Sequence, residues 1–363
     1  MIPMLDLRKE FLDIEDEVVG AVIEVLKGTR YILGPEVEAF ERRLAQYHGL
    51  SCCAGVGSGT GALFLSLASL PISPGDEIIT TPFTFFATVE SILYVGAKPV
   101  FVDIDNKTLN IDVDLIEQKI TKKTKAILPV HLFGLPCDMK RIMELAKKYN
   151  LYVIEDCAQS FGSSIDGRLT GTFGDAGCFS FYPSKNLGCY GDGGAVVTDN
   201  QDMYEIIMAL RNHGSRGNYI HSVVGFNSRL DEIQAAILLI KLNKVEGNNA
   251  NRRENAALYT SLLNGSVMCP YIPEGYTSNY HQYTIRSAHR DKIKDALHDA
   301  DISSVVYYPL PVHLQKPLGP FGYKKGDFPV AETAAAQVLS LPVYPGLSED
   351  AIGMIVEVIQ KCL

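Results

Sequence analysis

Short apolar segments alternate with longer segments of helical periodicity over residues 52–198, and this alternation constrains the fold more than any other feature. The apolar segments are Cys52–Val56, Glu77–Thr81, Pro99–Asp103, Ala126–His131 and Leu151–Glu155. Helical patterns lie between them at Phe86–Tyr94, Val113–Ile120 and Met139–Tyr149. Parallel strands need crossover connections and are covered on both faces. The sequence therefore predicts an α/β fold with a mostly parallel central sheet covered by helices.

The remaining segments predict an N-terminal arm and helix, a larger domain and a smaller one. We expect a helix at Glu36–His48, strands at Cys178–Tyr182 and Ala195–Thr198, and helices at Met203–Asn212 and Leu230–Leu242. The polar segment 244–255 suits a long helix that links two domains. Beyond it, we expect strands at His281–Arg286 and Ser304–Tyr308, and helices at Asp291–Ala300 and Ser348–Gln360. The prediction is a large domain over 1–245 and a small α+β domain over 246–363.

Charge and cysteine spacing exclude several classes of function. The 363-residue chain has a net charge of -9 and no basic block, which argues against nucleic acid as a partner. The eight cysteines show neither CxxC nor zinc spacing, so we expect reduced thiols and no metal site. We find no signal-peptide pattern and no apolar run of membrane-spanning length. We therefore expect a cytoplasmic protein that does not enter a membrane.

Three motifs carry groups of complementary chemistry. Lys185 lies between the β-type segment 177–182 and a glycine-rich turn in SFYPSKNLGCYGDGG. Asp156 follows the apolar segment 151–155, at the strand end where open α/β sheets bind ligands. The turn GSGTGAL, which contains Gly59 and Thr60, opens a helix whose N-terminus can bind a phosphate. A lysine, a carboxylate and a phosphate-binding turn are the groups that pyridoxal 5′-phosphate requires.

Each motif alone has an ordinary structural interpretation as well. Most lysines are solvated surface residues, an aspartate at a strand end often caps a helix, and glycine turns before helices are common. The GxGxxG dinucleotide pattern is incomplete, because Ala62 occupies its last glycine position. The three motifs are specific only in combination.

Together with four further motifs, they resemble a known family. The order GSGTGAL, TTPFTFFAT, FVDID, PVHLFG, VIEDCAQSFG, FSFYPSKNLGCYGDGG and GFNSRLDEIQAAIL is similar to that of the DegT-type sugar nucleotide aminotransferases, which are fold-type I pyridoxal phosphate enzymes. The resemblance runs from Pro35 to about residue 345. One departure is Gly61, where many relatives carry aspartate and others a small residue.

The resemblance implies roles for the residues around the cofactor ring. Lys185 would form the Schiff base, and Asp156 would pair with the pyridine nitrogen. Gln159 would contact the phenolic oxygen, and Phe85 would stack on the ring face. His131, in PVHLFG, either flanks the cofactor or is structural.

The resemblance also implies how the phosphate is held. Ser180, Gly59 and Thr60 would bind it within one subunit. Asn227, in GFNSRLDEIQ, would reach it from the neighbouring subunit. We therefore expect a homodimer with shared active sites.

Four residues are candidates for contacts with the substrate. Arg229 suits a substrate anion, although an ion pair at a helix start is the alternative. Tyr307, Tyr308 and His313 resemble the substrate-proximal loop of the family, and the tyrosines are equally compatible with an aromatic core patch.

The resemblance implies a ping-pong transamination. L-Glutamate would convert pyridoxal phosphate to pyridoxamine 5′-phosphate, which would then aminate a nucleotide-linked keto sugar for cell-surface polysaccharide, lipopolysaccharide or amino-sugar biosynthesis. The best match is a 3-keto hexuronate or a 3-keto-6-deoxyhexose, and C4 amination is the alternative. Lys185 argues against the family's dehydratases, which carry histidine there. A cyclitol aminotransferase and a non-catalytic regulatory relative remain as rival interpretations.

Overall fold

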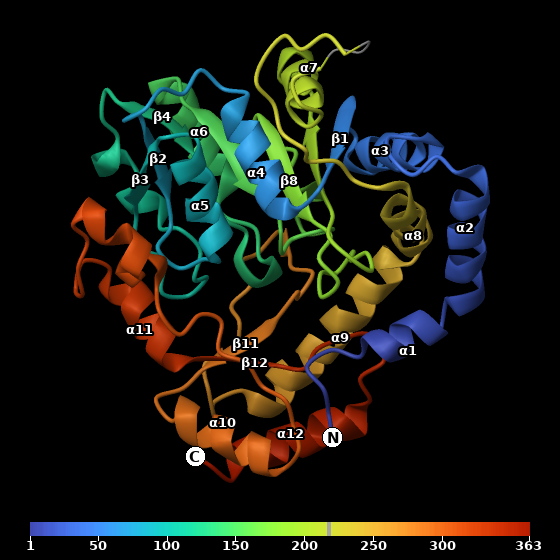
Figure 1. Cartoon of the computed structure of the whole chain (residues 1–363). Helices are drawn as coiled ribbons and strands as arrows, with labels where there is room; N and C mark the ends of the chain where they lie inside the picture. The colour runs from blue at the N-terminus through green and yellow to red at the C-terminus, as the bar shows by residue number, and fades with distance from the viewer. Residues whose placement is uncertain (216–218) are drawn as a thin grey trace.

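A seven-stranded sheet in the order β1-β9-β8-β5-β4-β2-β3 forms the centre of the computed structural model, which describes residues 1–215 and 219–363 (Figure 1). Its strands are β1 (Cys52–Val56), β2 (Glu77–Thr80), β3 (Lys98–Phe101), β4 (Thr124–Ile127), β5 (Tyr152–Asp156), β8 (Ala176–Ser180) and β9 (Gly194–Thr198). Strand β9 is antiparallel to both of its neighbours, and the other pairs in the sheet are parallel. The predicted fold class is confirmed.

Helices cover the sheet on both faces because successive residues of each strand point in opposite directions. Ile78 and Ile154 pack in one apolar cluster with α4 (Gly59–Ala68), α5 (Phe86–Tyr94) and α7 (Gln201–Leu210). Their chain neighbours Ile79 and Val153 pack in another cluster with α6 (Met139–Tyr149). At the β1–β9 end, α3 (Pro35–His48) and α8 (Glu232–Leu242) cover that second face. Burial on both faces explains why the strands are continuously apolar.

The C-terminal part is organised on the long helix α9 (Val245–Leu263), which descends from the sheet as Figure 1 shows. A two-stranded antiparallel sheet of β11 (Tyr283–Arg286) and β12 (Val338–Leu341) lies beside it. Helices α10 (Arg290–Asp299) and α12 (Glu349–Gln360) complete its apolar core. The arm α1 (Leu7–Leu12) leads to α2 (Glu15–Gly28), and Ile2 bridges to Ile302 in the C-terminal part.

Helix α11 (Pro329–Gln337) returns to the large sheet. The carboxylate of Asp103, just beyond β3, accepts hydrogen bonds from the Val330 and Ala331 backbone N–H groups at 3.0 and 2.9 Å. Residues of α11 share an apolar cluster with Phe83 and Phe101. Residues 312–337 therefore pack against the large sheet, although the predicted domain boundary at 245/246 assigns them to the small domain. That division into two domains stays a prediction.

Two secondary-structure predictions were wrong. The segment 113–120 was predicted as a helix and forms two 3₁₀ turns, Val113–Leu115 and Glu117–Lys119. Val113 and Ile116 are both buried, and their spacing of three residues places them on one side of an α-helix or of a 3₁₀-helix, so the pattern does not distinguish the two. Residues 304–308 form no strand, and only Val305 bridges to Ser340. The pattern missed the short strands β6 (Ser164–Ile165), β7 (Arg168–Leu169) and β10 (Tyr276–Thr277), and the 3₁₀ turns Leu132–Gly134, Val312–Leu314 and Lys316–Phe321.

Among the described residues, no helix is long and apolar enough to cross a membrane.

Candidate active site

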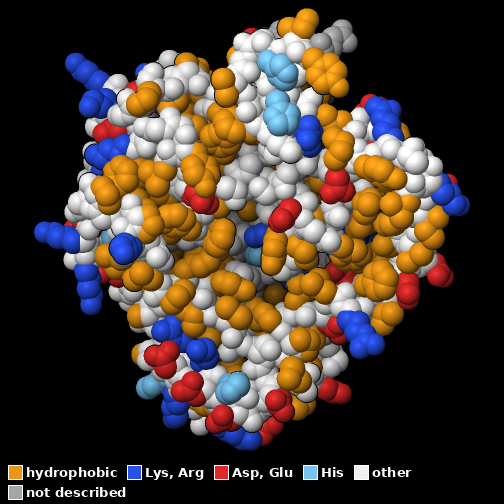
Figure 2. Space-filling model, in the orientation of Figure 1, with side chains coloured by type: hydrophobic (Ala, Val, Ile, Leu, Met, Phe, Trp, Pro, Cys, Tyr) orange, Lys and Arg blue, Asp and Glu red, His pale blue; other side chains and the backbone are white. Residues whose placement is uncertain are grey.

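A cavity of about 490 Å³ lies where the carboxyl ends of β5 and β8 meet the N-terminus of α4. Figure 2 shows that the face in view is hollowed near its centre, between the sheet and the C-terminal part. Nine predicted site residues line this cavity: Gly59, Thr60, Phe85, Asp156, Gln159, Ser180, Lys185, Tyr307 and Tyr308. Tertiary folding thus brings residues as far apart in the sequence as Gly59 and Tyr308 to one site.

Asp156 is the last residue of β5, and its buried carboxylate faces the cavity. Its Oδ2 accepts a hydrogen bond from Thr88 Oγ1 at 2.8 Å, and its Oδ1 accepts one from the Ala158 N–H at 3.1 Å. Burial raises the pKa of Asp156, while these two bonds and the charge of Lys185 act in the opposite direction. A buried carboxylate of this kind suits a cationic partner at short range.

Lys185 lies in the loop that follows β8 and is half-buried. Its backbone N–H donates to the Tyr182 carbonyl at 2.8 Å, which fixes the start of the loop. Burial lowers the pKa of Lys185 to about 8, while the charge of Asp156 acts to raise it. A larger share of neutral, nucleophilic amine is therefore present near neutral pH than for an exposed lysine.

The N-terminus of α4 forms a close-fitting cradle beside Ser180. Ser58 caps the helix by accepting a hydrogen bond from the Gly61 N–H at 3.0 Å, which leaves the N–H groups of Gly59 and Thr60 at the cavity. A Cβ atom on Gly59 would lie only 2.6 Å from the Ser180 Cβ. Free N–H donors at a helix N-terminus bind phosphate, so the cradle fits a phosphate group.

Aromatic and amide side chains form the opposite wall. Phe85 is 59% exposed, in contrast to the fully buried Phe83, and its ring centroid lies 6.2 Å from that of Tyr308. Gln159 Nε2 donates to the Tyr308 hydroxyl at 3.0 Å, and Gln159 Oε1 accepts from the Phe133 N–H at 2.6 Å. Burial raises the pKa of Tyr308. Phe85 therefore offers a free ring face inside the cavity.

Three predicted residues do not line this cavity. Asn227 is exposed at the surface, and Arg229 Nη1 donates to Asn212 Oδ1 at 2.7 Å. His313 is buried elsewhere, with its Nε2 3.2 Å from Glu332 Oε1 and its ring 4.7 Å from that of Phe328. The structure thus separates His313 from the tyrosines of its own sequence motif, because Val312–Leu314 turns back toward the sheet.

His131 is fully buried behind the cavity and does not line it. Its Nδ1 accepts from the Cys137 N–H at 3.0 Å, so Nε2 carries the proton and donates to Glu155 Oε2 at 3.0 Å. The Glu155 carboxylate also accepts from the N–H groups of residues 171, 173 and 174. Although His131, Glu155 and Cys157 lie close together, these bonds use the carboxylate lone pairs that a metal ion would need.

Sequence reasoning missed His281 and Thr88 as cavity residues. Asn186 Nδ2 donates to Asn249 Oδ1 at 2.7 Å, so Asn186 Oδ1 accepts from His281 Nδ1 at 3.1 Å. Burial and the charge of Lys185 lower the pKa of His281 well below its usual value, which keeps the imidazole neutral. His281 lies outside the sequence motifs, and Thr88 ends the motif TTPFTFFAT, which by itself does not indicate that this side chain reaches the cavity.

Comparisons with known proteins agree with this geometry. The profile of the DegT/DnrJ/EryC1/StrS aminotransferase family matches residues 12–360. UDP-N-acetyl-3-dehydro-alpha-D-glucosamine 3-aminotransferase of Acidithiobacillus ferrooxidans is 48% identical, and the match covers 100% of this chain and 98% of that protein.

Solved structures show the same fold. The structure of S. venezuelae DesV in complex with a ketimine intermediate has a TM-score of 0.97 and 40% identity, covering 99% of this chain and 98% of the other. The structure of Bacillus subtilis NtdA with bound cofactor PMP has a TM-score of 0.91 and 33% identity, covering 96% of this chain and 82% of the other.

The cavity fits the cofactor of these proteins. It offers a carboxylate from Asp156 at the end of β5, the amine of Lys185, and helix N–H donors in a cradle too tight for a Cβ at Gly59. These groups match the ring nitrogen, the aldehyde and the phosphate of pyridoxal phosphate. The predicted enzyme class and cofactor are confirmed. This chain belongs to the DegT/DnrJ/EryC1/StrS aminotransferase family and is a pyridoxal phosphate-dependent aminotransferase.

Proposed function

We propose that this enzyme transfers the amino group of L-glutamate to C3 of a nucleotide-linked 3-keto sugar by a ping-pong mechanism. The observation that carries the proposal is the convergence of Lys185, Asp156 and the N-terminus of α4 on one cavity. The name of the Acidithiobacillus relative specifies a UDP-linked 3-dehydro sugar and amination at C3, which favours C3 over C4. The product would serve amino-sugar or cell-surface polysaccharide biosynthesis.

Two residues carry the chemistry in this proposal. Pyridoxal phosphate supplies the electron sink when it is bound. Asp156 holds a proton on the ring nitrogen, because a buried carboxylate is most stable beside a cation. Lys185 Nζ takes the proton from the α-carbon of the donor and later returns one, a task that its lowered pKa of about 8 suits.

Other residues hold and orient the reactants. Gly59, Thr60 and Ser180 would bind the phosphate, while Gln159 would contact the phenolic oxygen. Phe85 would stack on the ring, which is consistent with its exposed face.

The proposal includes a homodimer with shared sites. Asn227 is exposed and lies outside the cavity of its own chain, which suits a contact with the phosphate in the neighbouring subunit. Arg229, two residues away, would bind a substrate anion from the same side, and its buried Nε has no hydrogen-bond partner among the residues that the structure describes. Tyr307 and Tyr308 would hydrogen-bond sugar hydroxyls. His313 has no role in this proposal, because it contacts Glu332 and Phe328 away from the cavity.

The first experiment tests the lysine. The enzyme is reduced with borohydride, digested and analysed by mass spectrometry, which should place the cofactor on the peptide that contains Lys185. The Lys185→Ala variant should lose turnover, whereas Lys147→Ala, a variant on the outer helix α6, should keep it. If the Lys185→Ala variant turned over substrate as fast as the wild type, the assignment of Lys185 would be contradicted.

The second experiment tests the substrate. The glutamate-reacted enzyme is offered a UDP-linked 3-keto-2-acetamido sugar, its hexuronate form, a dTDP-linked 3-keto-6-deoxyhexose and a 4-keto sugar nucleotide. We expect amination of a 3-keto substrate, and parallel double-reciprocal plots for the complete reaction. Preferential amination of the 4-keto sugar would overturn the assignment to C3.

A further inference from the structure

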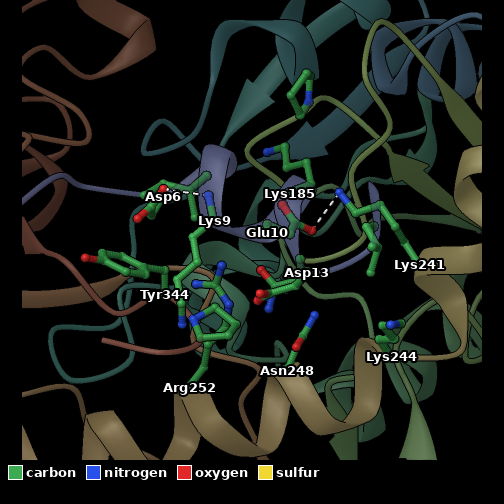
Figure 3. Close-up of a pocket in the computed structure, with 15 residues that line it drawn as sticks. Asp6, Lys9, Glu10, Asp13, Lys185, Lys241, Lys244, Asn248, Arg252 and Tyr344 are labelled. Carbon is green, nitrogen blue, oxygen red and sulfur yellow. Dashed lines mark hydrogen bonds and ion pairs between the residues drawn. The ribbon is translucent and has the colours of Figure 1, made fainter. Parts of the chain in front are cut away.

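A second cavity, of about 120 Å³, lies beside the cofactor cavity, and Lys185 lines both. Figure 3 shows that the arm and α1, the lysine loop, and helices α8 and α9 contribute its walls. Arg252, from α9, and Lys185, from the loop, enter it from different sides. Neither the sequence motifs nor the reaction described above assigns a role to this space.

Arg252 is the unusual member of the lining. Arg252 is only 5% exposed, and its one hydrogen bond to the described residues runs from Nη1 to the Tyr280 carbonyl at 3.4 Å. Across residues 1–215 and 219–363, no carboxylate lies within 4.0 Å of its guanidinium. A buried charge without a counter-charge is costly, so buried charges are normally paired.

Several neighbouring charged groups have partners other than Arg252. Lys241 Nζ lies 2.7 Å from Glu10 Oε1, and Lys244 Nζ lies 3.1 Å from Glu17 Oε1. The Asp6 carboxylate accepts from the backbone N–H of Lys9 at 2.9 Å. These pairs leave the guanidinium as a buried donor that is open to the cavity.

The lining as a whole carries more positive than negative side chains. Its cations are Lys9, Lys185, Lys241, Lys244 and Arg252, and its acids are Asp6, Glu10 and Asp13. A guanidinium presents a planar fork of N–H donors that matches a carboxylate in two parallel hydrogen bonds. A small carboxylate would therefore satisfy the charge of Arg252 and its free donors together.

We propose that this second cavity is a carboxylate-binding site with Arg252 as its anchor. Two sources share this chemistry. One is the distal carboxylate of a dicarboxylic amino donor, whose amino end lies at Lys185, and this source rests on the proposed function. The other is a free carboxylate anion that binds beside the active site.

The test uses glutarate, a dicarboxylate that has no amino group and does not react. Its binding to the full-length holoenzyme is measured by calorimetry for the wild type, Arg252→Gln and Arg253→Gln. Arg253 is the matched control, because it is adjacent on α9 and less buried. A lost hydrogen bond between charged groups predicts binding about 10- to 100-fold weaker in Arg252→Gln, with Arg253→Gln unchanged.

Kinetics of the glutamate half-reaction then distinguish the two sources. If the donor occupies the cavity, KM for glutamate rises by a similar factor in Arg252→Gln, while KM for the sugar nucleotide stays unchanged. If a free anion occupies it, Arg252→Gln loses glutarate binding but keeps its KM for glutamate. Both results support the carboxylate site, and the calorimetry needs no turnover, so it stands even if the proposed substrates are wrong.

Two results would overturn the proposal: Arg252→Gln binding glutarate as tightly as the wild type, or both variants losing it equally. Should Arg252→Gln fail to fold, Arg252→Lys retains the buried charge but loses the planar fork. That variant should also weaken glutarate binding, and undiminished binding would be equally damaging.

Discussion

The cradle at the N-terminus of α4 gives the sharpest prediction, because two glycines of one turn differ in the space around them. A Cβ on Gly59 would lie 2.6 Å from the Ser180 Cβ and 3.1 Å from the Ser180 Cα. A Cβ on Gly57 would have no heavy atom nearer than 3.6 Å, which is ordinary contact. Gly59→Ala must therefore displace either the start of α4 or the end of β8, whereas Gly57→Ala fits.

Overpacking of a well-packed site costs about 1–3 kcal/mol, so Gly59→Ala should lower the free energy of unfolding by that amount. Gly57→Ala should range from neutral to about 1 kcal/mol stabilising, because alanine restricts the unfolded chain. Urea denaturation of the cofactor-free variants measures both values.

The displaced cradle should also bind phosphate less well. Titration with pyridoxal phosphate should give a higher dissociation constant for Gly59→Ala and an unchanged one for Gly57→Ala. Equal stability and equal cofactor affinity in the two variants would refute the steric argument.

Three further predictions concern individual charges. Because only the neutral amine of Lys185 attacks the cofactor and its pKa is about 8, the rate of cofactor attachment should rise with pH up to about 8 and then level off; a rise that continues toward about 10.4 would indicate an ordinary lysine. Asp156→Asn should lower kcat about 10- to 100-fold in steady-state assays, through the loss of a charged hydrogen bond. Thr88→Val, which keeps the carboxylate but removes one hydrogen bond to it, should have a smaller effect, and the reverse order would contradict the assigned role. Glu155→Gln places an amide N–H group against backbone N–H donors, so it should lower the free energy of unfolding in urea by about 3 kcal/mol or more. A variant as stable as the wild type would contradict this prediction.

The strands and helices that sequence predicted well have strong local signals. Phe86–Tyr94 and Met139–Tyr149 coincide with α5 and α6, because their apolar positions repeat at helical spacing and Asp138 caps α6 through a hydrogen bond to the Arg141 N–H. The helix predicted at 244–255 corresponds to α9, which begins at Val245 and ends at Leu263, as the polar run and the following leucines indicated. The pattern missed α11, since the alanines of this helix carry little amphipathic signal.

The candidate site was predictable to the extent that its groups occur in contiguous motifs. Lys185, Asp156 and the Gly59–Thr60 turn each have a local signature, and the structure places all of them on one cavity. His281 lies in no such motif, and the motif TTPFTFFAT does not indicate that the side chain of its last residue, Thr88, reaches the site. Only the packing of the C-terminal part and of α5 brings these two residues to the strand ends. His313 shows the opposite case, a motif residue that the backbone turns away from the cavity.

The amino-acid sequence was sufficient to predict the α/β class, the seven strands of the central sheet, the cofactor motifs and the family resemblance. These properties depend on residue periodicity and on short contiguous motifs, which local physics can read. Three findings came from the tertiary structure alone: which side chains share a cavity, that residues 312–337 return to the sheet, and that Arg252 is buried with no carboxylate of the described residues within 4.0 Å of its guanidinium. Such facts depend on contacts between segments far apart in the chain, and the free energy of those contacts is set by packing and burial rather than by neighbours in sequence.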